Sequence, residues 1–388
     1  MNRLTGTATL DYRGVVRQVQ VCLDLDENVI ELLHTTPNFV KAMSIITNKD
    51  WDKSPAILTN INIVTPIGII TKDSLNNFYI TSYSPGSYSI PDSILTRILT
   101  LHKKEEGVTR ILLHPRSSGV SFKFQPFDAL SPNYELFLRG AKGSKVLPQP
   151  IELELNPGKV VIVQKDHGIT VKCDQPLSDK EEILRLSIGI LHGGPVTIQS
   201  ILEDTILTIN LAAHEGRSIG PLYINDKDVG ELLQKIINYL STISPTDYER
   251  WKVGIYFYLQ GLGGIAPLEI RAINLFTYLE IIDNRGQLEK TSIAPLLGLT
   301  IDEADLVCRT RNNLIHNGYS IGASLLAAEK SISDYKSPLE NTVFYIDRED
   351  KDKTGIKFFL TFAGLLNKLL VTRTGFIGEW NNYSKYEL

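Results

Sequence analysis

The spacing of apolar residues changes once along the chain, from a period of two to a period of 3.6. Before about residue 222, short alternating or β-branched runs are separated by Gly, Pro, Asn and Asp. The predicted strands are Thr7 to Leu10, Val15 to Leu23, Asn60 to Thr71, Phe78 to Tyr83, Arg110 to His114, Val120 to Phe124, Ile151 to Leu155, Val160 to Gln164, Ile169 to Cys173 and Ile206 to Leu211. Many strands at short spacing indicate sandwich-like sheets or one curled antiparallel sheet.

Two amphipathic segments interrupt the β-rich region, at Ile94 to Lys104 and Asp179 to Leu191, and we expect crossover helices there. The proline-containing segment Leu147 to Pro150 either separates two β subdomains or is a stiff loop inside one.

Beyond Asp226 the pattern is helical. We predict helices at residues 229–240, 248–259, 268–283, 300–317 and 356–372, which would form one bundle. The fold class expected is therefore α+β with several domains. A β-rich domain would span residues 1–222 and an all-α helical domain residues 223–388.

Composition narrows the class of protein. The chain has 388 residues, 43% hydrophobic and 22% charged, which is typical of a folded globular protein. It has no uninterrupted apolar run of 18 residues, and its start lacks the apolar stretch of a secretory signal. Its three cysteines are far apart and show no metal-ligand spacing. We expect a cytoplasmic protein with no membrane contact and no disulfide framework, metal or cofactor.

The most informative segment is residues 308–318, which concentrates Arg, Asn and His at the end of a predicted helix. Arg309, one of Asn312 and Asn313, and His316 share one helical stripe. In an ideal helix Arg311 is rotated by about 140° from His316. Its long side chain or a two-fold partner would have to bring the two together. We expect the opposite face of this helix to contribute Val307, Leu314 and Ile315 to the core.

An imidazole beside a guanidinium suits cleavage of RNA by its own 2′-hydroxyl. The imidazole takes or gives a proton, and the guanidinium holds the phosphate oxygens as negative charge builds up. This chemistry requires no metal, and a lone imidazole without companion ligands argues against metal-assisted hydrolysis.

The sequence from Arg311 to His316, Arg-Asn-Asn-Leu-Ile-His, resembles the R-N-x-x-x-H motif of HEPN domains. These are small helical bundles that commonly act as metal-independent endoribonucleases. The helix before the motif, the intervening loop, the helix-end position followed by Asn-Gly and a further helix resemble the ApeA-like HEPN group, which occurs in bacterial antiphage defence. The resemblance covers about residues 226 to 388.

The resemblance implies roles for individual residues. His316 would be the catalytic histidine, Arg311 the catalytic arginine, and Asn312 the polar residue that orients them or the scissile phosphate. Arg309 also satisfies the looser motif spacing, so the choice of arginine stays open. Glu280 resembles an acidic residue that some members keep near the motif; the alternative is that it pairs with an arginine such as Arg271.

The resemblance also implies partners: an RNA substrate, a second copy of the chain in a homodimer, and a phage-derived or other trigger bound by the β-rich region. Phe78, Tyr79, Tyr83 and Tyr88 could form a ligand platform there, with strand-core packing as the alternative. A second class of function remains, namely a HEPN-type dimerisation module that binds RNA or a partner without cutting.

Charge limits how RNA could bind. The whole chain has a net charge of −4, and residues 223–388 contain 18 Lys and Arg against 21 Asp and Glu. A broad electrostatic surface for RNA is therefore not expected. Binding would have to rely on a small basic cleft around the motif, doubled by dimerisation.

Overall fold

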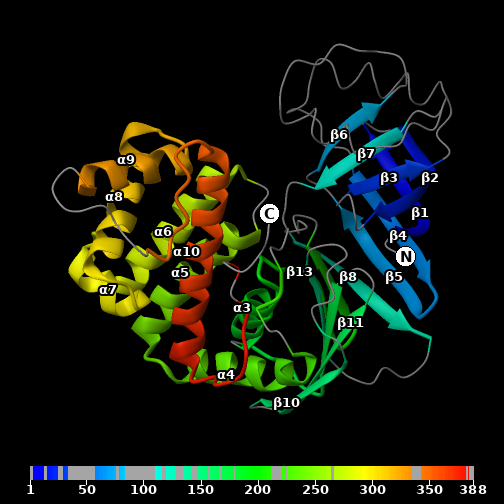
Figure 1. The fold of residues 1–388 in the computed structure, drawn as a ribbon. Helices are drawn as coiled ribbons and strands as arrows, with labels where there is room; N and C mark the ends of the chain where they lie inside the picture. The colour runs from blue at the N-terminus through cyan, green and yellow to red at the C-terminus, as the bar shows by residue number, and fades with distance from the viewer. Residues whose placement is uncertain are drawn as a thin grey trace. The chain divides into compact units, whose positions relative to one another are not determined.

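The structure is a computed structural model. It describes residues 3–12, 15–24, 29–33, 57–75, 78–83, 110–115, 119–127, 134–140, 147, 149–155, 158–165, 168–178, 180–210, 220–222, 225–263, 266–333, 342–381 and 383. The fold is α+β, with β-strands dominating the N-terminal half and helices the C-terminal half (Figure 1). The chain divides into two compact units, residues 1–136 with 198–213, and residues 137–197 with 214–388.

The first unit is built from antiparallel strands. They are β1 (Arg3–Tyr12), β2 (Val15–Asp24), β3 (Val29–Leu33), β4 (Ile57–Thr65), β5 (Gly68–Leu75), β6 (Phe78–Tyr83), β7 (Arg110–Pro115), β8 (Gly119–Pro126), β13 (Thr197–Glu203) and β14 (Ile206–Asn210). They are hydrogen-bonded in the order β13-β14-β8-β5-β4-β1-β2-β3-β7-β6. The described strands of this unit thus form one continuous hydrogen-bonded series. This arrangement agrees with the predicted curled antiparallel sheet and does not agree with the predicted sandwich-like sheets.

The core of this unit lies on a single face of the sheet. The alternating pattern sends every second side chain to that face. Register places Ile63 of β4 opposite Ile70 of β5, and Ile70 opposite Phe124 of β8. Leu23 of β2 lies opposite Ile30 of β3 in the same cluster.

The second unit combines strands with the helices. Its strands follow the order β10-β11-β12-β9, where β9 is Tyr134–Arg139, β10 Ile151–Leu155, β11 Gly158–Lys165 and β12 Gly168–Cys173. The unit begins at Phe137 and so takes in only the second half of β9. Its helices are α3 (Lys180–His192), α4 (Val229–Thr242), α5 (Pro245–Gly263), α6 (Leu268–Asp283), α7 (Lys290–Leu297), α8 (Ile301–Asn317), α9 (Ile321–Ser333) and α10 (Lys351–Thr374), with the short helix η1 (Asp226–Asp228) before α4.

Local sequence signals account for several of these helices. The six apolar residues predicted to form the stripe of α4, from Val229 to Leu240, are all buried. Helix α6 has the predicted bounds, and its predicted inner face is buried. Phe276 of α6 packs against Phe358 and Phe362 of α10, with ring centroids 6.4 and 4.7 Å away. These three rings form one part of the core of the helical region, between α6 and α10.

The compact units differ from the predicted division at residue 222. The change from strands to helices does fall there, because β14 ends at Asn210 and α4 begins at Val229. However, β10 to β12 and α3 belong to the helical unit, since α3 packs against α4 and α5, and β10 contacts α4. Hydrophobic periodicity reports which kind of element forms, and it carries no information on which core that element joins.

Other predictions about elements need correction. The single strand predicted at residues 60–71 is a hairpin of β4 and β5 that turns between Thr65 and Gly68. Strands β3, β9 and β13 and the helices α7 and α9 had no specific prediction. The helix predicted at residues 94–104 and the aromatic Tyr88 lie outside the described residues. The backbone of Phe78 to Tyr83 forms β6, while its side chains lie outside what the structure describes.

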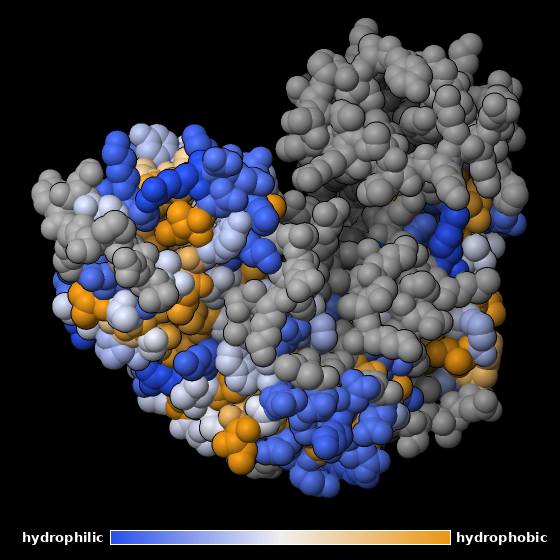
Figure 2. All heavy atoms as spheres, in the orientation of Figure 1, coloured by the Kyte–Doolittle hydropathy of each residue, from blue (hydrophilic) through white to orange (hydrophobic). Residues whose placement is uncertain are grey.

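Helix α10 is the one described helix that is long and apolar enough to cross a membrane, with a mean hydropathy of 1.4 in its most apolar window. In the structure 72% of that window is buried. Figure 2 shows the visible face of the helical unit as separate hydrophobic areas among hydrophilic ones. Burial against neighbouring helices gives α10 the character of a core helix.

Candidate active site at the end of α8

Helix α8 carries the motif, and its two ends are fixed by local chemistry. At the start, the Thr300 hydroxyl accepts a hydrogen bond from the Glu303 backbone N–H at 3.2 Å, and Glu303 accepts one from the Thr300 N–H at 2.9 Å. This is the predicted capping box. At the other end Gly318 adopts the left-handed conformation, with φ of 67°, and stops the helix directly after Asn317.

Of the three apolar residues predicted for the inner face of α8, two are buried and one is not, and the polar Glu303 and Thr310 are buried as well. Leu306, Val307 and Leu314 are buried. Ile315, which we expected in the core, is 37% exposed. Ile315 lies in the last turn of α8, and this turn leaves more than a third of the residue exposed.

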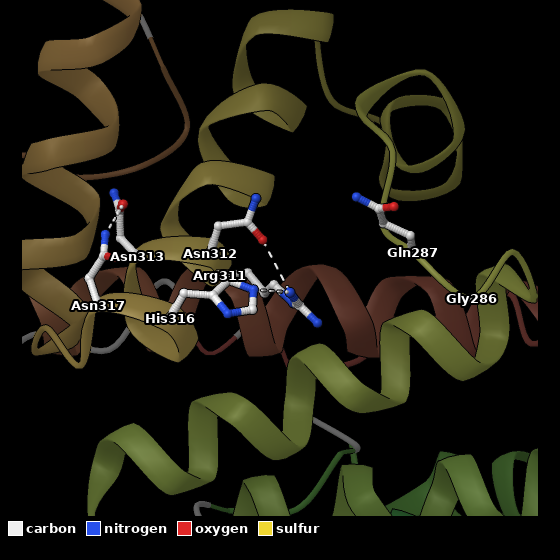
Figure 3. A pocket seen from close by; sticks show the side chains of 7 residues that line it. All are labelled: Gly286, Gln287, Arg311, Asn312, Asn313, His316 and Asn317. Carbon is white, nitrogen blue, oxygen red and sulfur yellow. Dashed lines mark hydrogen bonds between the residues drawn. The ribbon is translucent and has the colours of Figure 1, made fainter.

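A pocket of about 450 Å³ opens beside the last two turns of α8. It is lined by Gly286, Gln287, Arg311, Asn312, Asn313, His316 and Asn317, which we call the motif pocket (Figure 3). Gly286 and Gln287 belong to the loop between α6 and α7, and the other residues belong to α8. The pocket is thus made where this loop approaches the C-terminal end of α8.

Arg311 and His316 meet within one chain. The guanidinium Nη1 of Arg311 lies 3.4 Å from Nε2 of His316, and it also donates to Oδ1 of Asn312 at 3.1 Å. The long arginine side chain therefore overcomes the rotation between the two positions on the helix. Figure 3 shows the three side chains gathered at one point of the pocket, as the motif predicted.

Glu280 of α6 holds the other side of the same guanidinium. Its Oε1 lies 2.6 Å from Nη2 of Arg311, and both side chains are about one-fifth exposed, at 21% and 22%. Glu280 thus does pair with an arginine, as the alternative expected, but the partner is Arg311 of the motif and not Arg271. Arg271 instead donates to the backbone oxygens of Gly261 and Leu262 at the end of α5.

Arg309 turns away from the motif pocket. Its Nε lies 3.3 Å from Oδ2 of Asp305, and its Nη1 donates to the Ser331 hydroxyl of α9 at 2.9 Å. Of the two arginines that the motif spacing allowed, Arg311 is the one in contact with His316 in the structure.

Sequence reasoning missed Gln287, and it treated Asn317 only as a helix-end signal. Asn317 donates to Oδ1 of Asn313 at 3.1 Å, and Asn313 donates to the Ser324 backbone oxygen at 3.2 Å. The i, i+4 spacing of the two asparagines could have indicated their bond. Gln287 lies outside α8, and its place in the pocket depends on how α6, α7 and α8 pack.

The motif pocket differs from the basic cleft that we expected. Arg311 is its one permanently charged cation among the described residues, and Glu280 shares that charge. The remaining polar lining is neutral carboxamide, apart from the imidazole of His316. A phosphate bound here would compete with Glu280 for the guanidinium.

Cys308 lies one turn before Asn312 on α8, and its thiol is not a nucleophile of this site. Burial, followed by the charge of Asp305, raises the pKa of Cys308 to about 11. The thiol therefore stays protonated near neutral pH, and it donates weakly to the Leu288 backbone oxygen at 3.7 Å. Its role is to tie the loop between α6 and α7 to α8.

Within the described part of the chain, no three His, Cys, Asp or Glu residues come together as a metal-ion site. Comparison with protein-family models, with curated proteins and with solved structures finds no match for this chain.

Proposed function

We propose that the chain is a metal-independent endoribonuclease of the HEPN type, with His316 as general acid or base and Arg311 as the stabiliser of the phosphorane. The observation that carries the proposal is the 3.4 Å approach of Arg311 Nη1 to His316 Nε2 in an open pocket. A proton-transfer group and a fixed cation at this distance can contact the same phosphodiester.

In the proposed reaction the 2′-oxygen attacks the adjacent phosphorus after losing its proton, and the bond from phosphorus to the 5′-oxygen breaks. The departing oxygen takes up a proton. The products are a 2′,3′-cyclic phosphate and a 5′-hydroxyl. Arg311 faces the non-bridging oxygens while charge accumulates on them, and Asn312 keeps the guanidinium oriented through its Oδ1.

The HEPN assignment is supported by the arrangement around the motif. Helix α6 precedes it, a loop and the short α7 follow, α8 carries the motif at its C-terminal end, and α9 comes next. The order of α6, α8 and α9 agrees with what the resemblance implies, while α7 is an additional short helix where only a loop was expected.

We further propose that the active species is a homodimer in which two motif pockets face one another. One imidazole can serve as base while the other serves as acid. The exposed apolar side chains Ile315 and Tyr319, 37% and 46% exposed beside the motif, would be covered by a second copy.

The biological part of the proposal is antiphage defence in the cytoplasm. The β-rich unit would bind a phage-derived or other trigger and would hold cleavage at a low basal rate, measurable with purified protein, until the trigger arrives. Restraint is expected because unrestrained RNA cleavage would harm the host cell.

The test is cleavage of labelled single-stranded RNA in the presence of EDTA. Wild-type protein should release fragments that end in 2′,3′-cyclic phosphate. His316→Ala should lose this activity, and DNA of the same sequence should stay intact because it lacks the 2′-hydroxyl. Cleavage that His316→Ala leaves unchanged would remove His316 from the mechanism.

A second candidate function is an RNA- or partner-binding dimerisation module without turnover. The ion pair between Glu280 and Arg311 favours it, because the guanidinium already has an anionic partner. RNA binding with no cleavage under any trigger would support this second function.

A further inference from the structure

The lining of the motif pocket is rich in carboxamide side chains, and these differ in the hydrogen bonds that they make within the protein. Asn313 and Asn317 bond with each other, and Asn313 also bonds with the α9 backbone. Asn312 gives its oxygen to Arg311. Gln287 is exposed and takes part in none of the hydrogen bonds found between described residues, so its side chain offers both an acceptor and a donor to a ligand.

The loop that carries Gln287 is braced on both sides. Gly286 before it has a φ of 75°, a left-handed turn that glycine adopts without strain. Leu288 after it is buried, at 8% exposure, and its carbonyl accepts the bond from Cys308. The Ser292 hydroxyl of α7 donates to Oδ2 of Asp283 at 2.8 Å and joins the two helix ends that flank the loop.

Gln287 lies opposite the reactive pair across the pocket. Figure 3 shows its amide group directed toward Asn312, with Arg311 and His316 below. A pocket of about 450 Å³ lies within the range of volumes that hold small organic ligands. There is thus room beside the phosphate position for a group of the adjacent nucleotide.

We propose that Gln287 is a specificity-determining residue that binds the edge of the nucleobase beside the scissile phosphate and favours adenine. The inference rests on the proposed ribonuclease function. A glutamine amide matches the neighbouring donor and acceptor of adenine, N6 and N7, with two hydrogen bonds. Single-stranded RNA exposes such edges because its bases are free to splay out of the stack.

The chemistry of the lining agrees with base recognition in preference to additional phosphate contacts. A second phosphate would call for a further cation, and the described lining offers carboxamides instead. The expected preference for adenine over the other bases is about fivefold to tenfold. This is at the low end of the range for a contact made by two hydrogen bonds, because Gln287 remains exposed to water.

The test compares four full-length proteins: wild type, Gln287→Ala, Gln287→Glu and Asn284→Gly. Asn284 is the matched control, since it lies in the same loop outside the pocket lining and its φ of 57° suits glycine. Cleavage sites are mapped on an RNA pool of random sequence. Each variant is also combined with His316→Ala, and its binding to short oligoadenylate, oligocytidylate and oligouridylate is measured.

Wild type and Asn284→Gly should favour adenine in both assays, and Gln287→Ala should lose the preference without a change in thermal unfolding. Gln287→Glu should move the preference toward cytosine, whose N4 amino group donates to a carboxylate. Cleavage with a base preference that Gln287→Ala leaves intact would overturn this inference and keep the ribonuclease. Absence of cleavage would count against the ribonuclease function. The role of Gln287 would then be judged from the binding assay alone, where loss of the adenine preference in Gln287→Ala would support it and an unchanged preference would overturn it.

Discussion

Glu280 and Arg311 form an ion pair that joins α6 to α8, with 2.6 Å between Oε1 and Nη2. The same guanidinium reaches His316 and Asn312 through Nη1. Glu280 therefore holds Arg311 through one terminal nitrogen while the other terminal nitrogen contacts the imidazole. It touches none of the atoms proposed to react, so its role is that of a positioning residue.

Glu280→Gln should lower the turnover number for RNA cleavage roughly fivefold, equivalent to about 1 kcal/mol for a partly exposed ion pair. The amide keeps the shape of the carboxylate but no longer fixes the guanidinium by charge. RNA affinity should stay equal or increase, because a negative charge near the phosphate is removed. Steady-state kinetics that separate kcat from KM check this split.

The matched control is Glu269→Gln, which makes the same change in the first turn of α6, away from the motif pocket. It should leave both kinetic constants unchanged. An equal loss in the two variants would show that the effect of Glu280 is general destabilisation of α6.

The two arginines of α8 should respond differently to lysine. Arg311→Lys replaces a planar group that contacts Glu280, Asn312 and His316 by a single ammonium group, and cleavage should fall on the order of a hundredfold. Arg309→Lys keeps a charge beside Asp305 and should stay within about twofold of wild type. The same labelled RNA is used for both proteins. A larger loss of cleavage in Arg309→Lys than in Arg311→Lys would identify Arg309 as the catalytic arginine.

The sequence predicted the parts of this site that depend on neighbouring residues. The capping box of Thr300 and Glu303 and the inner face of α6 follow from local spacing, and both are confirmed. The motif also indicated Arg311 and His316 as residues that act together. These signals act within one or two helical turns, where side-chain geometry follows from the backbone.

Contacts between elements could not be predicted in the same way. Arg309 turns toward Ser331 because α9 packs beside α8, and Gln287 enters the pocket because α7 and its loop fold back. A single sequence does not contain the packing that decides either outcome. The same reason explains why α3 and β10 to β12 join the helical unit while the periodicity indicated a boundary near residue 222.

Thr300→Ala should destabilise the helical unit by about 1 kcal/mol, because the Glu303 N–H loses its side-chain acceptor. The melting temperature should fall by about 2 to 4 °C, as for a domain of this size. Differential scanning calorimetry measures the shift. Thr291→Ala, on the exposed surface of α7, is the matched control and should leave the melting temperature unchanged. An equal shift in both variants would contradict a specific role for the cap.

His192 should make folding stability depend on pH in a defined window. It ends α3 at 1% exposure, and burial lowers its pKa from 6.5 to about 4. In the unfolded chain the imidazole takes up a proton as the pH falls below 6.5, whereas in the folded chain it stays neutral until about pH 4. The unfolded state binds more protons between these values, so the free energy of unfolding should decrease as the pH falls through this window.

The decrease due to His192 should reach about 3 kcal/mol at the acidic end of the window. Urea unfolding followed by circular dichroism, at pH 6.5 and at about pH 4, measures it. His192→Gln has no titrating group at this position and should show a smaller decrease, even if its stability at pH 6.5 is lower. If His192→Gln and wild type lose the same free energy across the window, protonation of the buried imidazole does not control the acid stability of the helical unit.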